Sequence, residues 1–294
     1  MRRLLTCVGV LIVVLASCAT APKVSERRPL DLLPGDETAY LSASSEAARL
    51  FFPPMIGMQG EDANVDAFFD RTERIYAGIK TGVEGERVFH LVSQGEYPKN
   101  LLGFVFSKQR GFVRKQKPYS HWENIEEGIR VASAGSGYLL ISNGDAESMF
   151  SGIDGNGYPF PSWVQEGLEN SALAVYVPYV KAFSELSANT QLPILPDGFG
   201  VSSLFVVLFP GDASTYRLTL VLGAESEQDA QAFVSLGKLL LLKRAKEKGN
   251  KAVMSLMHDV TIAAEGNSVR VEGLILHEDE VKSLIGMVLG GMHD

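Results

Sequence analysis

The stretch Leu204-Phe205-Val206-Val207-Leu208, which leads into Pro210-Gly211, gives the clearest indication of the fold. After the turn, Arg217 to Leu222 alternates between polar and apolar residues up to Gly223. Runs rich in β-branched and aromatic residues on both sides of a glycine-containing turn are typical of a β-hairpin. The segment therefore predicts two antiparallel strands, at 201–209 and 215–222.

A related pattern occurs in the preceding half of the chain. A shift of 129 residues aligns Ile75-Tyr76-Ala77-Gly78-Ile79 with residues 204–208, and a shift of 131 aligns Val131-Ala132 with Ile262-Ala263. Near the two starts, Ala39-Tyr40-Leu41 corresponds to Val175-Tyr176-Val177. Because the matches keep their order along the chain, the sequence predicts an internal duplication.

Each half predicts a β-α-β-β-α-β-β-α unit. Neighbouring hairpins imply antiparallel pairing, so we expect the α+β class, with antiparallel sheets covered by amphipathic helices. In each half a short strand leads through a helix-prone stretch to a hairpin, an apolar helix, a second hairpin and a closing helix. In the first half we expect a strand at 38–43, a hairpin of 73–80 with 86–93, a helix at 98–108, a second hairpin with its turn at 135–137, and a helix at 145–153. In the second half we expect a strand at 172–177, a hairpin of 201–209 with 215–222, a helix at 226–247, a second hairpin with its turn at 266–268, and a helix at 277–289.

The first eighteen residues carry an export signal. Arg2 and Arg3 precede an apolar run from Leu4 to Ala16, which is too short to cross a ~30 Å hydrocarbon core as a helix but suits a signal peptide. The run ends in Leu15-Ala16-Ser17-Cys18, which resembles the lipobox of bacterial lipoproteins. That resemblance implies cleavage before Cys18, transfer of a diacylglyceryl group to its thiol and acylation of the new N-terminus. An ordinary secretory signal with a chance cysteine is the alternative.

The mature chain divides into a tether and two halves. Ala19 to Leu30 has no apolar periodicity, and its twelve residues reach at most about 40 Å when extended. Asp154 to Pro161, rich in proline and glycine, marks the boundary between the halves. We expect a signal peptide at 1–17, a lipidated tether at 18–33, a first half at 34–153, a linker at 154–170 and a second half at 171–292.

Composition and charge exclude several classes of protein. The 294 residues are 46% hydrophobic and 21% charged, which excludes a disordered chain and a polytopic membrane protein. The net charge is −8, from 27 Lys and Arg against 35 Asp and Glu, so we expect no nucleic-acid partner. The outer membrane is favoured as the location, because alanine rather than aspartate follows Cys18.

The spacing of polar residues predicts no catalytic, cofactor-binding or metal site. Ser235-Leu236-Gly237-Lys238 and Lys80-Thr81-Gly82 match motifs of penicillin-binding proteins, but their order along the chain is reversed. Gly135-Ser136-Gly137 lacks the third glycine of a dinucleotide-binding loop. The five histidines form no H-x-x-x-H pair. We therefore expect a non-enzymatic protein without a cofactor.

Apolar segments beside basic residues are candidates for contact with a membrane. Residues 98–118 carry six basic residues and no acidic one, and the four leucines at 239–242 precede a basic run. Such segments are attracted by anionic headgroups and by apolar burial, although a core helix with a solvated basic end explains the pattern equally well. The segment Leu50–Ile56 is a third candidate, in which Pro53 and Pro54 are expected to interrupt any helix. The candidate membrane-interface residues are Phe51, Phe52, Leu101, Leu102, Phe104, Phe106, Lys108, Arg110, Arg114, Lys115, Lys117, Lys243, Arg244, Lys246 and Lys248.

A lipobox, a short tether, an acidic α+β body and amphipathic helices together resemble the concealed outer-membrane lipoproteins of treponemes. The resemblance implies a position on the periplasmic leaflet, insertion of amphipathic helices and raised membrane permeability, and it implies no site residue beyond Cys18. We therefore expect an outer-membrane lipoprotein whose partners are membrane lipids, reached through Cys18 and the basic segments. The alternative is a periplasmic interaction or lipid-carrier protein, with a groove between its halves for a partner protein or lipid.

Overall fold

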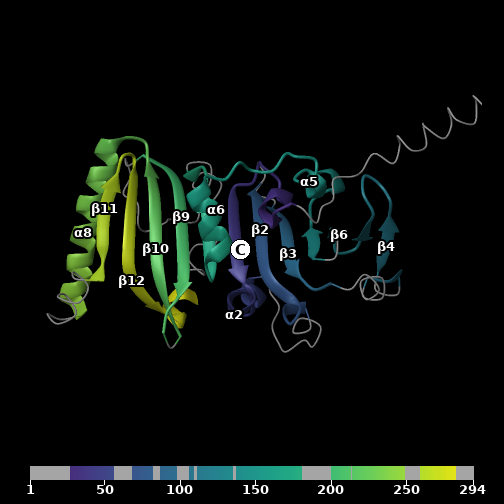
Figure 1. The fold of residues 1–294 in the computed structure, drawn as a ribbon, viewed down its shortest axis with the longest axis horizontal. Helices are drawn as coiled ribbons and strands as arrows, with labels where there is room; N and C mark the ends of the chain where they lie inside the picture. Colours follow the sequence, from purple (N-terminus) through teal and green to yellow (C-terminus); the bar gives the residue numbers. More distant parts are fainter. Residues whose placement is uncertain are drawn as a thin grey trace, which may run out of the picture.

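An antiparallel sheet of twelve strands forms the framework of the protein (Figure 1). The computed structural model describes residues 27–55, 68–81, 87–97, 106–108, 111–134, 137–180, 200–212, 214–248 and 259–282. The α+β class expected from the sequence is confirmed, because this large antiparallel sheet is accompanied by a few helices. The strands are β1 (Ala39–Ser44), β2 (Thr72–Thr81), β3 (Arg87–Gly95), β4 (Phe112–Lys115), β5 (His121–Asn124), β6 (Ile129–Ala134), β7 (Tyr138–Ser142), β8 (Leu173–Val177), β9 (Val201–Pro210), β10 (Thr215–Ala224), β11 (Thr261–Glu265) and β12 (Ser268–His277). The named helices are η2 (Pro29–Leu32), α2 (Ser45–Met55), α5 (Ala146–Phe150), α6 (Ser162–Asn170) and α8 (Glu227–Lys248).

The two halves of the chain share this one sheet. The strand order is β11-β12-β10-β9-β8-β1-β2-β3-β7-β6-β5-β4, so the halves meet where β1 pairs with β8. In that antiparallel pair Tyr40 lies opposite Tyr176, and Leu41 lies opposite Val175. The boundary between the halves is therefore a ladder of hydrogen-bonded strands.

Helices and loops cover both faces of the sheet at this boundary. Side chains alternate between the two faces of a strand, so Tyr40 of β1 belongs to one hydrophobic cluster and Ala43 to another. Tyr40 shares its cluster with Leu30 of η2, with Phe150 of α5 and with residues of α6. Ala43 packs with residues of α2 on the opposite face. In Figure 1, α6 lies across the middle of the sheet and α8 lies along the β11 end.

The stretch expected to link the halves contains α6. Val164 and Leu168 of this helix are fully buried in the cluster that also holds Tyr40 and Phe205. Gly167 allows the close approach, because a Cβ atom there would lie 2.5 Å from Cζ of Phe205. The C-terminal part of the 154–170 segment therefore belongs to the hydrophobic core of the protein.

The four expected hairpins lie where the sequence predicts them, whereas the helix α2 differs from the expectation. The observed β2–β3, β9–β10, β6–β7 and β11–β12 pairs match the expected hairpins, and α8 matches the helix expected at 226–247. The expectation that prolines interrupt a helix at 50–56 is wrong, because α2 continues to Met55. Pro53 and Pro54 lie in the last turn of α2, so the two N–H donors that they lack are at the end of the helix, which ends one residue after Pro54.

Candidate functional site

The anchor and part of the expected membrane surface lie outside the described residues. These are Cys18, Leu101, Leu102, Phe104 and Arg110. Phe51 and Phe52 lie in the C-terminal half of α2, but their side chains are outside the described part of the structure. Their contact with lipid stays a prediction.

The first basic segment, residues 98–118, is described at 106–108 and 111–118, and part of it forms strand β4. Phe106 lies outside any helix and packs against Phe112 and Trp122, with ring centroids 5.1 and 5.7 Å apart. Arg114 and Lys115 lie on β4, the last strand of the sheet, and Arg114 stacks over Trp122. Exposed charges on an edge strand hinder its pairing with other chains, which gives these residues a structural role. Lys108 and Lys117 are exposed.

The second basic segment is the C-terminal part of α8. Leu239 and Leu240 are 64% and 48% exposed, whereas the next residue, Leu241, packs against the hydrophobic cluster between α8 and the sheet. Lys238 and Lys243, on either side of the leucines, are also exposed. Arg244, Lys246 and Lys248 continue the helix, and their side chains lie outside the described set. The helix thus combines exposed leucines with neighbouring lysines.

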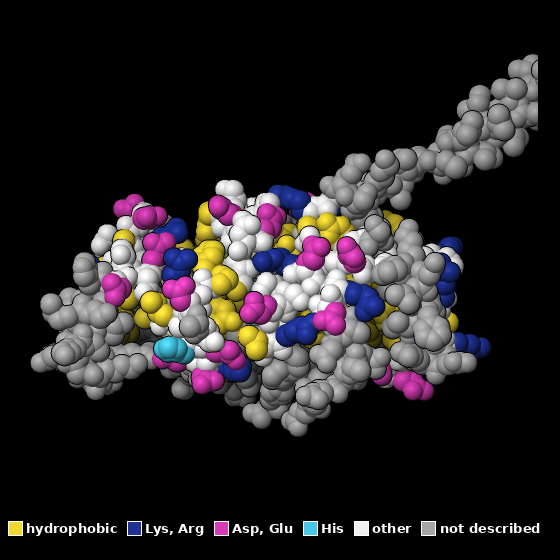
Figure 2. All heavy atoms as spheres, turned by 60° about the horizontal axis from the view of Figure 1, so that its bottom comes forward, with side chains coloured by type: hydrophobic (Ala, Val, Ile, Leu, Met, Phe, Trp, Pro, Cys, Tyr) yellow, Lys and Arg dark blue, Asp and Glu magenta, His cyan; other side chains and the backbone are white. Residues whose placement is uncertain are grey.

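The charges on the face seen in Figure 2 are mixed. Lys and Arg side chains are interspersed there with Asp and Glu, and hydrophobic side chains gather in a band between them. The described side chains on this face therefore form no extended patch of a single charge sign. Electrostatic attraction to an anionic surface would have to act locally, at a segment such as the end of α8.

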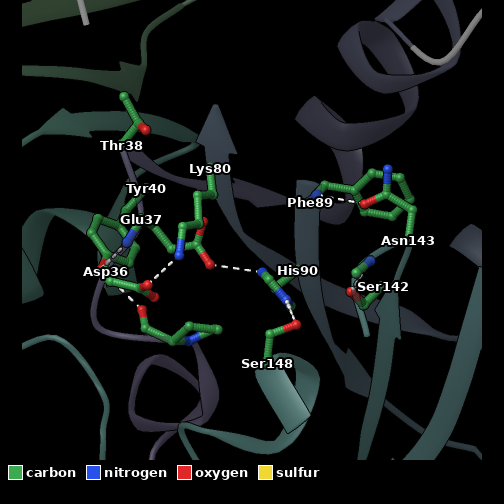
Figure 3. Close-up of polar contacts among 12 residues, drawn as sticks. Asp36, Glu37, Thr38, Tyr40, Lys80, Phe89, His90, Ser142, Asn143 and Ser148 are labelled. Atoms are coloured by element: carbon green, nitrogen blue, oxygen red, sulfur yellow. Dashed lines mark hydrogen bonds and ion pairs between the residues drawn. The ribbon is translucent and has the colours of Figure 1, made fainter. Parts of the chain in front are cut away.

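A buried polar cluster, which we call the Glu37 cluster, comprises Glu37, His90 and Ser148 (Figure 3). Glu37 precedes β1, His90 lies on β3 and Ser148 lies on α5. Nδ1 of His90 is 2.7 Å from Oε1 of Glu37, and Nε2 of His90 is 3.1 Å from Oγ of Ser148. The side chains of Glu37 and His90 are 0% and 5% exposed. Burial raises the pKa of the Glu37 carboxyl, and the contact with His90 offsets part of that rise.

Two glycines make room for this cluster. A Cβ atom on Gly78 of β2 would lie 2.6 Å from Cγ of Glu37. A Cβ atom on Gly144 would lie 2.9 Å from Oγ of Ser148 and 3.2 Å from Nε2 of His90. Any larger residue at these positions would have to displace the polar side chains, so the glycines are part of the site.

The order of groups in the Glu37 cluster, carboxyl, imidazole and hydroxyl, is that of a nucleophilic triad. A nucleophile also needs a cavity that brings a substrate to it. Two described cavities, of about 450 and 330 Å³, are lined by other residues, among them Arg27 with Tyr158 and Arg74 with Glu169. Within the cluster, the 2.7 Å contact places Glu37 and His90 close enough to share a proton.

The sequence gives one signal for this cluster. His90 interrupts the apolar run from Val88 to Val92 on β3, and a buried imidazole needs a polar partner. The partners are 53 and 58 residues away along the chain, so sequence spacing could not identify Glu37 and Ser148.

Among the described helices, none is long and apolar enough to cross a bilayer. A lipobox ahead of this α+β body indicates the class of membrane-anchored lipoproteins. More particularly, the family model described as outer membrane-associated lipoprotein TP0453 matches residues 25–155. The location that the sequence predicts, at the outer membrane, agrees with that description.

Solved structures extend the likeness over both halves. Crystal form I of TP0453 has a TM-score of 0.63 and 15% identity, over 91% of this chain and 98% of that chain. Crystal form IV has a TM-score of 0.62 and 16% identity, over 90% of this chain and 99% of that chain. No curated protein matches the sequence. The resemblance of the body to treponemal lipoproteins, expected from the sequence, is thereby confirmed.

Proposed function

We propose that this protein is a non-enzymatic lipoprotein, anchored through Cys18, that contacts the periplasmic leaflet of the outer membrane through the C-terminal part of α8. The observation that carries the proposal is the exposure of Leu239 and Leu240 beside Lys238 and Lys243. Leucines in this setting gain free energy by entering the interface, and lysines beside them gain by facing anionic headgroups. Insertion of this helix would perturb the packing or permeability of that leaflet.

The expected affinity is modest. Full burial of a leucine side chain contributes about 1.5–3 kcal/mol, so two half-exposed leucines add roughly 2–3 kcal/mol. Each lysine near an anionic surface adds about 1 kcal/mol. A contact of this size is reversible, and an anchor would strengthen it by raising the local concentration of the body at the membrane.

The tether is short enough to keep the body of the protein near the bilayer. Between Cys18 and Arg27, the first described residue, lie eight residues, which reach at most about 28 Å. Lipids reached through Cys18 and through α8 are thus the proposed partners. A periplasmic protein that binds the body stays the alternative, although β1–β8 pairing, α2 and α6 occupy the boundary where the groove was expected.

We also propose that the two halves arose by duplication, as the sequence predicts. Outward from β1 the order is β2-β3-β7-β6, and outward from β8 it is β9-β10-β12-β11. The registers agree as well. Ile79 pairs with Phe89 in the first half, and Leu208 pairs with Leu218, each 129 residues later, in the second.

The membrane contact can be tested by co-flotation of residues 19–294, produced without lipid, with vesicles that contain anionic or only zwitterionic lipids. We expect flotation with anionic vesicles at low salt, weaker flotation at moderate salt because charges are screened, and leakage of an entrapped dye. Leu239→Gln combined with Leu240→Gln should weaken binding about tenfold or more.

The matched control replaces two other exposed apolar residues, Ile125 and Ile275, which are 68% and 57% exposed. Ile125→Gln combined with Ile275→Gln should bind vesicles like the unmodified chain. No flotation at either salt concentration, or equal losses in the two double variants, would contradict a specific role of α8.

A further inference from the structure

The Glu37 cluster joins three parts of the first half that are distant in sequence. Glu37 lies in the segment Pro34–Thr38, which connects η2 with β1, and its carboxylate meets β3 and α5 through His90 and Ser148. The same segment is held by backbone contacts. The Glu37 N–H donates to the hydroxyl of Tyr40 at 3.4 Å, and that hydroxyl donates to the Pro34 carbonyl at 2.9 Å.

His90 is the group in direct polar contact with the Glu37 carboxyl, through the 2.7 Å approach of Nδ1 to Oε1, and Lys80 acts on the carboxyl from further away. Oε1 and Oε2 of Glu37 and Nδ1 of His90 are buried and have no hydrogen bond of standard geometry among the described residues. The charged groups around the cluster have other partners, and Figure 3 shows one of these pairs, Lys80 with Asp36. Lys80 forms an ion pair with the exposed Asp36, Asp145 accepts from the backbone of α5, and Arg130 binds Glu123 and the Gly144 carbonyl.

The number of protons on the pair therefore sets its net charge. With a proton on the Glu37 carboxyl, the pair with the imidazole is uncharged, and the carboxyl can donate that proton towards Nδ1 of His90, 2.7 Å away. Loss of that proton leaves a carboxylate buried without compensation, which is a costly state. The Ser148 hydroxyl can accept from Nε2 or donate to it, and it can also donate to the Asp145 carbonyl, 3.0 Å away.

We propose that Glu37, His90 and Ser148 form a proton-dependent latch that holds the segment Pro34–Thr38 against β3 and α5. The latch is closed while the pair keeps its shared proton, and it loosens when that proton is lost. It acts on the connection between the sheet and the N-terminal part of the chain, which leads towards the expected anchor. The inference does not depend on how α8 meets a membrane.

The direction of the pH dependence follows from the burial of Glu37. Because its pKa is raised in the folded protein, the folded state keeps a proton that the unfolded chain would lose. The stabilisation is complete below the ordinary pKa of a glutamate and is lost as the pH rises through the folded-state pKa. The latch should therefore open on the alkaline side.

Hydrogen exchange of the backbone amides between Leu30 and Tyr40 measures the latch directly. In the unmodified protein, their protection, corrected for intrinsic exchange and referred to amides of α6, should fall about tenfold per pH unit between the ordinary pKa of a glutamate and the raised folded-state pKa, and should level off above it. Glu37→Gln should remove this fall, because a neutral amide has no proton to lose. Asp36→Asn removes a neighbouring charge that raises the pKa of the Glu37 carboxyl, so this variant should keep the fall but show it at lower pH.

A second measurement covers the case in which Glu37→Gln does not fold. Carbon-13 NMR of the glutamate carboxyls in the unmodified protein should reveal one carboxyl that titrates above its ordinary pH range, in step with the exchange of residues 30–40. Protection that is independent of pH, a Glu37 carboxyl that titrates in its ordinary range, or loss of the fall in Asp36→Asn would overturn the proposal.

Discussion

At the scale of single residues, glycine determines whether a charged group can be buried beside the sheet. Gly78 of β2 faces the methylene groups of Glu37 at a distance that leaves no room for a methyl group. Glu37 cannot move aside easily, because its carboxylate is enclosed and in contact with His90. The site therefore depends on a residue that carries no polar group itself.

Gly78→Ala should lower the free energy of unfolding by roughly 1–3 kcal/mol, the usual cost of overpacking a buried site. Urea denaturation measures this loss. The control is Gly137→Ala, where the nearest atom to an added Cβ would be 3.9 Å away, and it should change stability by no more than about 0.5 kcal/mol. Equal effects of the two substitutions would show that the space around Glu37 is not limiting.

At the scale of elements, α6 and α8 illustrate two uses of a leucine on a helix. Leu168 of α6 is fully buried beneath the aromatic residues at the boundary between the halves. Leu239 of α8 is exposed, although residues of the same helix, such as Ala230 and Phe233, pack into the core. The first helix packs against strands of both halves, and the second leaves two leucines exposed for contact with another surface.

Leu168→Ala should therefore cost about 2–5 kcal/mol of unfolding free energy, because it removes buried apolar surface and leaves a cavity. Leu239→Ala, the same chemical change on an exposed position, should stay within about 0.5 kcal/mol. Thermal or urea unfolding of the two variants distinguishes them. A small loss at Leu168 would mean that the segment 154–170 behaves as a linker rather than as part of the core.

At the scale of the whole molecule, the two halves form a joint core. One hydrophobic cluster contains Tyr40, Tyr76 and Val92 from the first half together with Phe205 and Val207 from the second. Separation of the halves would expose this surface and would also break the β1–β8 ladder. Cooperative behaviour of the full chain follows from that shared interior.

Differential scanning calorimetry should accordingly record one unfolding transition, in which the calorimetric enthalpy equals the van't Hoff enthalpy. The measurement is best made on residues 19–294, so that the signal peptide and the lipid do not contribute. Two resolved transitions, or a calorimetric enthalpy well above the van't Hoff value, would indicate that the halves unfold as separate domains despite the continuous sheet.

Local patterns in the sequence predicted much of the fold. Alternating apolar residues around turns such as Gly266-Asn267 fix where hairpins form, because both strands and the turn are encoded within a few residues. The capped helix after Ser226 is local in the same way, since the side chain of Ser226 accepts from the Asp229 N–H. The lipobox needed only the four residues Leu15 to Cys18, whereas the match to the outer membrane-associated lipoprotein model extends over residues 25–155.

The sequence by itself determined the hairpins and the α+β class, because each depends on neighbouring residues. It also determined the resemblance to treponemal lipoproteins, which follows from the lipobox and tether together with the acidic, patterned body. Only the tertiary structure decided that the halves share one sheet and that Leu239 is exposed whereas Leu168 is buried. It alone brought Glu37, His90 and Ser148 together. These outcomes depend on contacts between residues that are distant along the chain, and burial, unlike periodicity, is a property of the whole packed molecule.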